Sequence, residues 1–227
     1  MTAQWMGIMG EHANSVAPLL VSTEQGYLKS TFCKSLLPAA LQRYYMDKVD
    51  LTSEGRVERR LAEMGLLNLD EFDKYPPTKM PLLKNLMQMA SLSLCKAYQK
   101  NHRSLPRIAS FIGTSNRKEL LTDPTGSRRF ICVMVKRPID CNGIEHKQIY
   151  AQLKAEILSG ERYWFTKEEE QVLQKNNLSF YRQGPVEDVL RSCYRSVEKG
   201  EEGELRSAAE IFQCLKKKNP SAMRGAN

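Results

Sequence analysis

Apolar, strand-like segments that alternate with segments of helical periodicity constrain the fold of this chain most strongly. The strand-like segments are residues 16–22, 64–69, 108–114 and 131–135. Helices are predicted at 29–37, which Pro38 ends, and at 80–90, where apolar residues recur at spacings of three and four. Apolar strands that alternate with helices are typical of a parallel sheet covered on both faces. The sequence therefore predicts an α/β fold with a central, mostly parallel sheet flanked by helices.

The sequence predicts two departures from this alternation. A short strand at 92–97 leads into a basic tip, which indicates a β-hairpin insertion. After Lys136 only helices are predicted. Residues 145–158 are amphipathic, and capping-box patterns at 166–169 and 207–210 open further helices. Because the last helix lies so close to the end of the sequence, we expect a fragment of a longer protein.

The charge balance favours an anionic partner. The 227 residues include 34 Lys and Arg against 26 Asp and Glu, which gives a net charge of +8. Such an excess attracts nucleic acid or nucleotide phosphates. The apolar runs are shorter than the about 20 residues of a membrane-spanning helix, and the N-terminus does not read as a signal peptide. The cysteines lack zinc-site spacing. We expect a cytoplasmic protein with no membrane partner.

The loop between the first strand and the first helix carries the first candidate site. It reads Gln25-Gly26-Tyr27-Leu28-Lys29-Ser30-Thr31. In a phosphate-binding loop, backbone N–H groups surround the anion, the lysine reaches the terminal phosphates, and the following hydroxyl binds Mg²⁺. The candidate nucleotide-binding residues are Gln25, Gly26, Lys29, Ser30 and Thr31. The full pattern has glycine where this chain has Thr23 and Leu28. A chance occurrence of Lys-Ser-Thr therefore explains the segment as well as a phosphate-binding loop does.

Polar residues follow two further strands. Asp70 and Glu71 end the strand-like segment 64–69, and Asn116 closes the segment 108–114 two residues later. A carboxylate at a strand end can hold Mg²⁺, while a second carboxylate orients water and an Asn senses the γ-phosphate. The alternatives are an acidic loop for Asp70 and Glu71 and a simple chain turn for Asn116.

Two basic regions complete the candidates. Arg128 and Arg129 precede the strand at 131–135 and can neutralise charge on a transferring phosphoryl group, or can be solvated surface residues. Residues 95–107 are basic without an acid, and their candidate contacts to a single nucleic-acid strand are Lys96, Tyr98, Lys100 and Arg103, with Arg107 and His102 beside them. A solvated hairpin explains this segment equally well.

These residues together resemble the virulence-associated protein E family, in the superfamily 3 helicase-like branch of the AAA+ ATPases. The most specific stretches are 111–116 (Phe-Ile-Gly-Thr-Ser-Asn) and 121–130 (Leu-Thr-Asp-Pro-Thr-Gly-Ser-Arg-Arg-Phe). Residues 29–32 and 68–73 agree with the family in order and spacing. The resemblance covers roughly residues 14–180.

The resemblance implies a P-loop AAA+-like core with ATP and Mg²⁺ as cofactors. Lys29 and Ser30 would bind the triphosphate and metal, Asp70 and Glu71 would form the Walker B pair, and Asn116 would be the sensor. Arg128 or Arg129 would act across a subunit interface. A homo-oligomer, a hexamer by analogy, single-stranded DNA and a primase-like domain or partner are the implied partners. The expected parts are a P-loop core (1–140), its helical C-terminal part (141–200) and the start of a truncated small C-terminal domain (201–227).

Two hypotheses of different classes follow. The first is an ATP-hydrolysing, DNA-translocating helicase-like domain of a mobile-element or phage-type replication protein. The alternative is a non-enzymatic nucleic-acid-binding or assembly module with a degenerate nucleotide site, which Thr23, Leu28 and the net positive charge favour. A third reading, a virulence effector, rests on the family's name alone.

Overall fold

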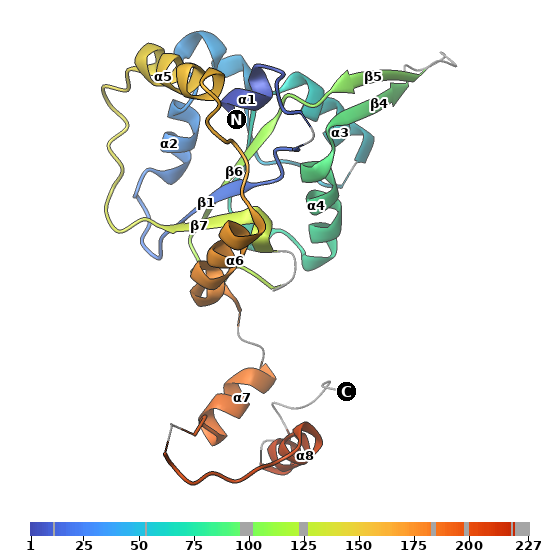
Figure 1. Ribbon diagram of the computed structural model, residues 1–227, viewed down its shortest axis with the longest axis vertical. Helices are drawn as coiled ribbons and strands as arrows, with labels where there is room; N and C mark the ends of the chain where they lie inside the picture. The colour runs from blue at the N-terminus through green and yellow to red at the C-terminus, as the bar shows by residue number, and fades with distance from the viewer. Residues whose placement is uncertain are drawn as a thin grey trace. The chain divides into compact units, whose positions relative to one another are not determined.

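The chain folds into two compact units, Met1–Tyr181 and Arg182–Asn227 (Figure 1). The computed structural model describes residues 1–10, 12–52, 54–95, 102–122, 127–182, 185–197, 200–218 and 220. The finer division that the sequence predicts, with boundaries after residues 140 and 200, stays a prediction.

A five-stranded parallel sheet forms the centre of the first unit. Its strands lie in the order β2-β3-β6-β1-β7, and their bounds are β1 Ala17–Val21, β2 Tyr45–Asp47, β3 Leu66–Leu69, β6 Ser110–Ser115 and β7 Phe130–Met134. Every neighbouring pair is parallel. This confirms the predicted α/β class, and four of the five strands overlap the predicted segments.

The order of the strands decides where a site can form. After β1 the chain forms β2, β3 and β6, which all lie on one side of β1 in the sheet, and then β7, which lies on the other side. The direction in which strands are added therefore reverses between β6 and β1. In open parallel sheets, ligands bind beyond the carboxyl ends of the strands at such a switch point. The segments that follow β1, β3 and β6 all reach this edge.

Helices cover both faces of the sheet, and each face has its own apolar cluster (Figure 1). Helices α3 (Glu54–Glu63) and α4 (Met80–Gln88) contribute to the larger cluster. The helices α1 (Thr2–Trp5) and α2 (Lys29–Ser35) line the other. Helix α5 (His146–Leu158) joins that face, where the Tyr150 hydroxyl donates to the Leu36 carbonyl oxygen at 2.6 Å. Alternate residues of each strand point to opposite clusters, as the strand period requires.

Close packing at the middle of the sheet depends on Gly113 in β6. A Cβ at this position would lie 2.6 Å from Leu19 Cδ2 and 3.1 Å from the Leu69 carbonyl oxygen. Leu19 belongs to β1 and Leu69 to β3, the two strands that flank β6. The glycine therefore permits both neighbours to pack closely over β6, just below the edge that carries the candidate site.

The hairpin and the remaining elements lie outside the main sheet. Strands β4 (Ser91–Cys95) and β5 (His102–Pro106) pair antiparallel as a separate two-stranded sheet, which confirms the predicted hairpin. Helix α6 (Lys167–Asn176) begins with the predicted capping box at Thr166 and Glu169. The short 3₁₀ helices are η1 (Ala39–Tyr44), η2 (Phe72–Lys74), η3 (Pro77–Lys79), η4 (Ser127–Arg129) and η5 (Asn177–Phe180).

The described residues of the second unit form two helices, α7 (Pro185–Cys193) and α8 (Ala208–Lys218). The predicted capping box is present at the start of α8, where the Glu210 N–H donates to Ser207 Oγ at 3.3 Å and the Ser207 N–H donates to Glu210 Oε2 at 2.7 Å. In the part of the chain that the structure describes, no helix combines the length and apolar character needed to cross a membrane.

Candidate functional site

The candidate site lies at the carboxyl edge of the sheet, where the segments after β1, β3 and β6 meet. Lys29 comes from the first turn of α2, Asp70 follows β3 directly, and Asn116 follows β6 directly. The three residues are far apart in the sequence. The order of the strands, with β6 between β1 and β3, brings them to one place.

The Lys29 side chain connects the loop after β1 to the loop after β6. Its Nζ donates to Ser22 Oγ at 2.6 Å and to Asn116 Oδ1 at 2.9 Å. Lys29 is only 7% exposed. Burial lowers the pKa of its ammonium below the ordinary value, and the charges of Asp70 and Asp73 oppose that shift. The site therefore holds a partly desolvated cation, which a bound anion would stabilise.

Asp70 is the centre of a second set of contacts. Ser30 Oγ donates to Asp70 Oδ1 at 2.8 Å, and Thr114 Oγ1 donates to the same oxygen at 2.7 Å. Two hydroxyl groups from different elements thus fix one carboxylate oxygen. Ser30 follows Lys29 directly, so the cation and the carboxylate face the same small volume at the edge of the sheet.

This donor set fits Mg²⁺ bound together with a phosphate ligand. Magnesium prefers oxygen ligands and is usually held by one or two carboxylates, substrate phosphates and water. Ser30 and Asp70 supply a hydroxyl and a carboxylate oxygen at hydrogen-bond distance from each other. Among the described residues there is no group of three or more His, Cys, Asp or Glu that could hold a metal ion by itself. A metal at Asp70 would therefore need ligands from a nucleotide and water.

Glu71 lies next to Asp70 in an unusual backbone conformation. Its φ of 52° and ψ of 49° are left-handed, which costs free energy for a residue other than glycine. Its N–H donates to Thr114 Oγ1 at 3.3 Å, and its carboxylate pairs with Lys74 Nζ at 2.6 Å. The Lys74 side chain is 67% exposed, so this ion pair is weak and its carboxylate is easily released.

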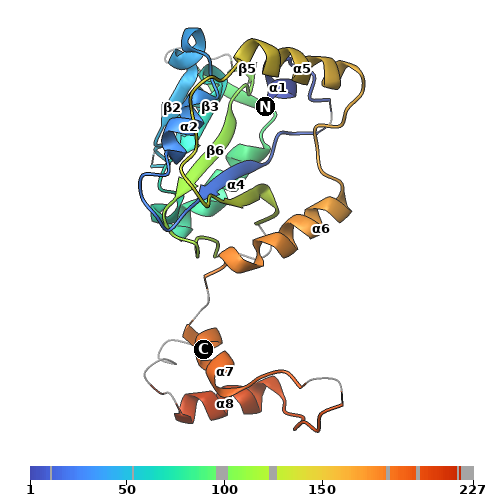
Figure 2. The ribbon, with the colours of Figure 1, turned by 90° about the vertical axis from the view of Figure 1, so that its left-hand side faces the viewer.

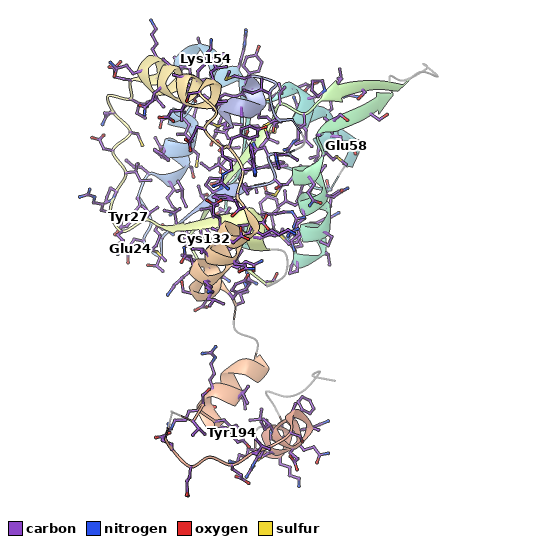
Figure 3. All side chains as sticks on the ribbon, in the orientation of Figure 1. Glu24, Tyr27, Glu58, Cys132, Lys154 and Tyr194 are labelled. Carbon is purple, nitrogen blue, oxygen red and sulfur yellow. The ribbon has the colours of Figure 1, made fainter. Side chains whose placement is uncertain are left out.

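The loop before Lys29 is open, although it lacks the two expected glycines. Gly26 has a φ of 80°, and Leu28 is left-handed with a φ of 58°. The Leu28 side chain is 46% exposed, so it does not fill the loop. Gln25 is exposed on the loop, and Thr31 is exposed in the first turn of α2. Glu24 and Tyr27 mark this loop in Figure 3.

The structure separates the two candidate arginines from this cluster. Arg128 and Arg129 lie in η4, directly before β7, and the first residue of β7 pairs with Ala17, the first residue of β1. They therefore lie at the amino edge of the sheet, opposite the edge that carries Lys29. The Arg128 guanidinium pairs with Glu170 of α6 at 3.3 Å, and the Arg128 side chain is 46% exposed.

The candidate nucleic-acid contacts can be placed only in part. Lys96, Tyr98 and Lys100 lie outside the described residues, and Arg103 lies in β5 without a described side chain. The prediction that Arg107 belongs to an accessible basic surface is wrong. Arg107 is only 1% exposed, and its guanidinium donates to the carbonyl oxygens of Asn14 and Leu86. Its desolvation lowers the pKa of its side chain to about 10.

Sequence reasoning missed Ser22, Asp73, Thr114 and Ser115 as members of the site. Ser22 accepts from Lys29, Thr114 donates to Asp70, and Ser115 Oγ donates to Asp73 Oδ1 at 2.8 Å. Ser22, Thr114 and Ser115 are each no more than 3% exposed. A signal was present in the sequence: polar residues at the ends of otherwise apolar strands need hydrogen-bond partners when they are buried.

The fold and the site together define an α/β protein with a hydroxyl, ammonium and carboxylate cluster at the carboxyl edge of a parallel sheet. Residues 13–182 match the family described as the virulence-associated protein E-like domain. The chain therefore belongs to this family, which confirms the resemblance seen in the sequence. Residues 183–227 match a family described as a domain of unknown function from a B. Theta gene. No curated protein matches the chain.

Among solved structures, the chain resembles the C-terminal region of NrS-1. The A form apo structure of that region is 18% identical, with a TM-score of 0.41. The match covers 78% of this chain and 37% of the chain in that structure. A second apo structure of the region is 17% identical, with a TM-score of 0.43. The match covers 78% of this chain and 39% of the chain in that structure. This chain thus spans less than two-fifths of the length of these matched chains.

Proposed function

We propose that this chain is an ATP-hydrolysing, DNA-translocating helicase-like domain of a phage-type or mobile-element replication protein. The observation that carries the proposal is the meeting of Lys29, Ser30 and Asp70 at one edge of the sheet, with Ser30 Oγ 2.8 Å from Asp70 Oδ1. A triphosphate site needs a cation for the phosphates and a hydroxyl and a carboxylate for the metal. The cation and the hydroxyl come from consecutive residues, and the order of strands brings the carboxylate to them from 40 positions away.

Each residue has a defined task in this proposal. Mg²⁺, when bound, would supply positive charge to the phosphate oxygens, and Ser30 and Asp70 would hold it. The Lys29 ammonium would exchange its hydrogen bond to Ser22 for phosphate oxygens and keep its hydrogen bond to Asn116. The Glu71 carboxylate would leave Lys74 and accept a hydrogen bond from the attacking water. Asn116, which already contacts Lys29, would respond to the presence of the γ-phosphate.

Arg128 and Arg129 fit this proposal only in a homo-oligomer. Strand β7 separates them from the site edge by its full length, about 16 Å for a strand of this size. That distance exceeds the reach of an arginine side chain, so either arginine would serve the site of a neighbouring subunit. An arginine finger contributes about 10³–10⁵ in rate. We therefore expect the isolated subunit to be a slow ATPase, with full activity in a ring that is a hexamer by analogy.

The experiment compares Mg²⁺-ATP turnover of the wild type and of Lys29→Ala, each with and without single-stranded DNA. We expect turnover that DNA stimulates in the wild type and loss of turnover in the variant. The matched control is Lys154→Ala, which removes an exposed lysine on α5 (Figure 3). Equal rates of Mg²⁺-ATP turnover for the wild type and Lys29→Ala would contradict the proposal.

A second candidate function is a nucleic-acid-binding or assembly module without ATPase activity. The left-handed Leu28, at a position where a phosphate loop has glycine, favours this alternative together with the net charge of +8. It predicts DNA binding that weakens steeply with salt and no rise of the melting temperature with Mg²⁺-ATP. A clear rise of the melting temperature with Mg²⁺-ATP would favour the first function.

A further inference from the structure

Asp73 is a buried carboxylate beside the site that has no task in the proposed reaction. It lies three residues after Asp70, in the short helix η2, and its side chain is only 7% exposed. Burying a carboxylate costs free energy unless its oxygens are paired. The contacts that pair it therefore indicate what the residue does.

Two contacts of the Asp73 carboxylate lead to the loop after β6. Ser115 Oγ donates to Asp73 Oδ1 at 2.8 Å, and Arg117 Nε lies 3.7 Å from Asp73 Oδ2. These two residues flank Asn116 on either side. The Arg117 N–H also donates to Ser115 Oγ at 3.0 Å, which closes a tight turn around Asn116. One carboxylate thus anchors both ends of the turn that presents Asn116.

Asp73 is itself held firmly in place. The preceding residue, Phe72, is 3% exposed and packs edge-on against Phe130 with 4.9 Å between ring centroids. The Lys74 N–H donates to the Glu71 carbonyl oxygen at 2.8 Å. Asp73 therefore connects the segment that carries Asp70 and Glu71 to the turn that carries Asn116, directly beside the core residue Phe72.

We propose that Asp73 is a positioning residue, which holds the turn of Asn116 so that Asn116 Oδ1 stays within hydrogen-bond distance of Lys29 Nζ. This inference deepens the proposed function and rests on it, because Asn116 matters for catalysis only if the site hydrolyses ATP. Asp73 acts through Asn116 and does not touch the nucleotide. Its loss should slow the chemical step while nucleotide binding by Lys29, Ser30 and Asp70 continues.

The kinetic test uses Asp73→Ala and Asp73→Asn. We expect Asp73→Ala to lower kcat about 10- to 100-fold, since small displacements of a positioned group have effects of this size. KM for Mg²⁺-ATP should stay within about threefold of the wild type. Asp73→Asn keeps an oxygen for Ser115 and should retain more of the rate. Unchanged kcat in Asp73→Ala, or an effect on KM alone, would overturn the proposal.

Asp50→Ala is the matched control. Asp50 also accepts from a hydroxyl, that of Thr52 at 2.6 Å, and lies 3.8 Å from a guanidinium nitrogen of Arg56. Its side chain is 49% exposed, and it lies between β2 and α3. We expect Asp50→Ala to leave both kcat and KM unchanged. If Asp50→Ala lost as much rate as Asp73→Ala, the loss would reflect a general effect on stability, and this result would contradict the proposal.

A double-mutant comparison separates positioning from stability. In an Asn116→Ala background, Asp73→Ala should cause no further loss of kcat, because the residue through which it acts is gone. A further loss as large as in the wild type would overturn the proposal. If Asp73→Ala does not fold, Arg117→Ala replaces it, because the Arg117 side chain is 71% exposed and its removal cuts one of the two anchors.

A spectroscopic measurement keeps this inference distinct from the proposed function. The side-chain amide resonances of Asn116, identified by their loss in Asn116→Ala, should shift in Asp73→Ala and in Arg117→Ala but not in Asp50→Ala. If the wild type hydrolyses no ATP, the proposed function fails, and these shifts alone decide whether Asp73 positions Asn116. Unshifted resonances in both variants would overturn the inference, whatever the ATPase result.

Discussion

Ser30 Oγ lies 2.8 Å from Asp70 Oδ1, although 40 positions separate the two residues in the chain. Ser30 belongs to the helix after β1, and Asp70 directly follows β3, which is not adjacent to β1 in the sheet. The contact forms across the end of β6, whose Thr114 donates to the same carboxylate oxygen. Three elements therefore fix one carboxylate at the point where the proposed nucleotide would bind.

Replacing Leu28 by glycine should stabilise the protein. Leu28 has a left-handed backbone with a φ of 58°, a conformation that costs a residue other than glycine about 1–2 kcal/mol. Glycine loses about 0.5–1 kcal/mol through its greater freedom in the unfolded chain. We expect Leu28→Gly to be more stable than Leu28→Ala in urea unfolding, because alanine keeps the Cβ that causes the strain. An alanine variant as stable as the glycine variant would contradict this reading of the loop.

Replacing Gly113 by alanine should destabilise the protein. The new Cβ would lie 3.1 Å from the Leu69 backbone oxygen and 2.6 Å from Leu19 Cδ2. Overpacking of this kind costs about 1–3 kcal/mol. Gly55→Ala is the control, since Gly55 lies in α3 with open space around its Cβ position. That variant should be neutral or slightly more stable, as measured by thermal or urea unfolding, and an equal loss in both variants would argue against the packing at β6.

The thiol of Cys33 should resist modification in the folded protein. Cys33 lies in α2 with no exposed surface, and burial, with smaller contributions from Asp47 and Asp70, raises the pKa of its thiol to about 12. The thiolate is the reactive form, so reaction at mildly alkaline pH requires opening of α2. Mass spectrometry after pulse labelling should find Cys33 unmodified while the partly exposed Cys141 reacts. Comparable labelling of both cysteines in the native state would show that α2 does not pack as described.

The stability of the protein should depend on pH through Lys29. Burial lowers the pKa of Lys29 below its ordinary value of 10.5, so the unfolded chain binds this proton more tightly than the folded chain. Above the lowered pKa and up to 10.5, unfolding therefore takes up a proton, and stability rises with pH. We expect the unfolding free energy of the wild type to rise with pH relative to that of Lys29→Met. Lys154→Met, which replaces an exposed lysine on α5, is the matched control for the substitution itself; Figure 2 labels this helix. An unfolding free energy of the wild type that falls with pH, relative to that of Lys29→Met, would contradict this prediction.

Mixing two inactive variants should restore ATPase activity if the arginine acts between subunits. Lys29→Ala lacks the phosphate lysine but keeps the arginines, and Arg128→Ala keeps an intact site edge. Because η4 and the site lie at opposite edges of the sheet, a mixed interface would contain one complete site. We expect the mixture to exceed the activity of either variant alone, while addition of the double variant to Arg128→Ala gives no gain. The same experiment with Arg129→Ala identifies which arginine acts.

Local patterns in the sequence predicted much of the sheet and most of the helices. Apolar segments of strand length located β1, β3, β6 and β7, and the Thr166 capping box located the start of α6. The three-residue strand β2 and the helix α3 were missed. Strand β2 is too short for a pattern, and α3 is largely polar, with Val57 and Leu61 as the buried apolar residues among those whose side chains are described. Such elements depend on tertiary packing more than on their own residues.

The sequence alone established which chemical groups would stand at the ends of the parallel strands, because strand and helix periods and the polar residues that follow them are local properties. It placed Lys29, Ser30, Asp70 and Asn116 at one edge for that reason. The contacts themselves came from the strand order: β6 between β1 and β3 brings Asn116 to Lys29 and Thr114 to Asp70. The burial of Arg107 and Asp73 and the outward direction of Leu28 also depend on neighbours distant in the chain. Interactions between such neighbours are not encoded in any short stretch of residues, so only the folded chain reveals them.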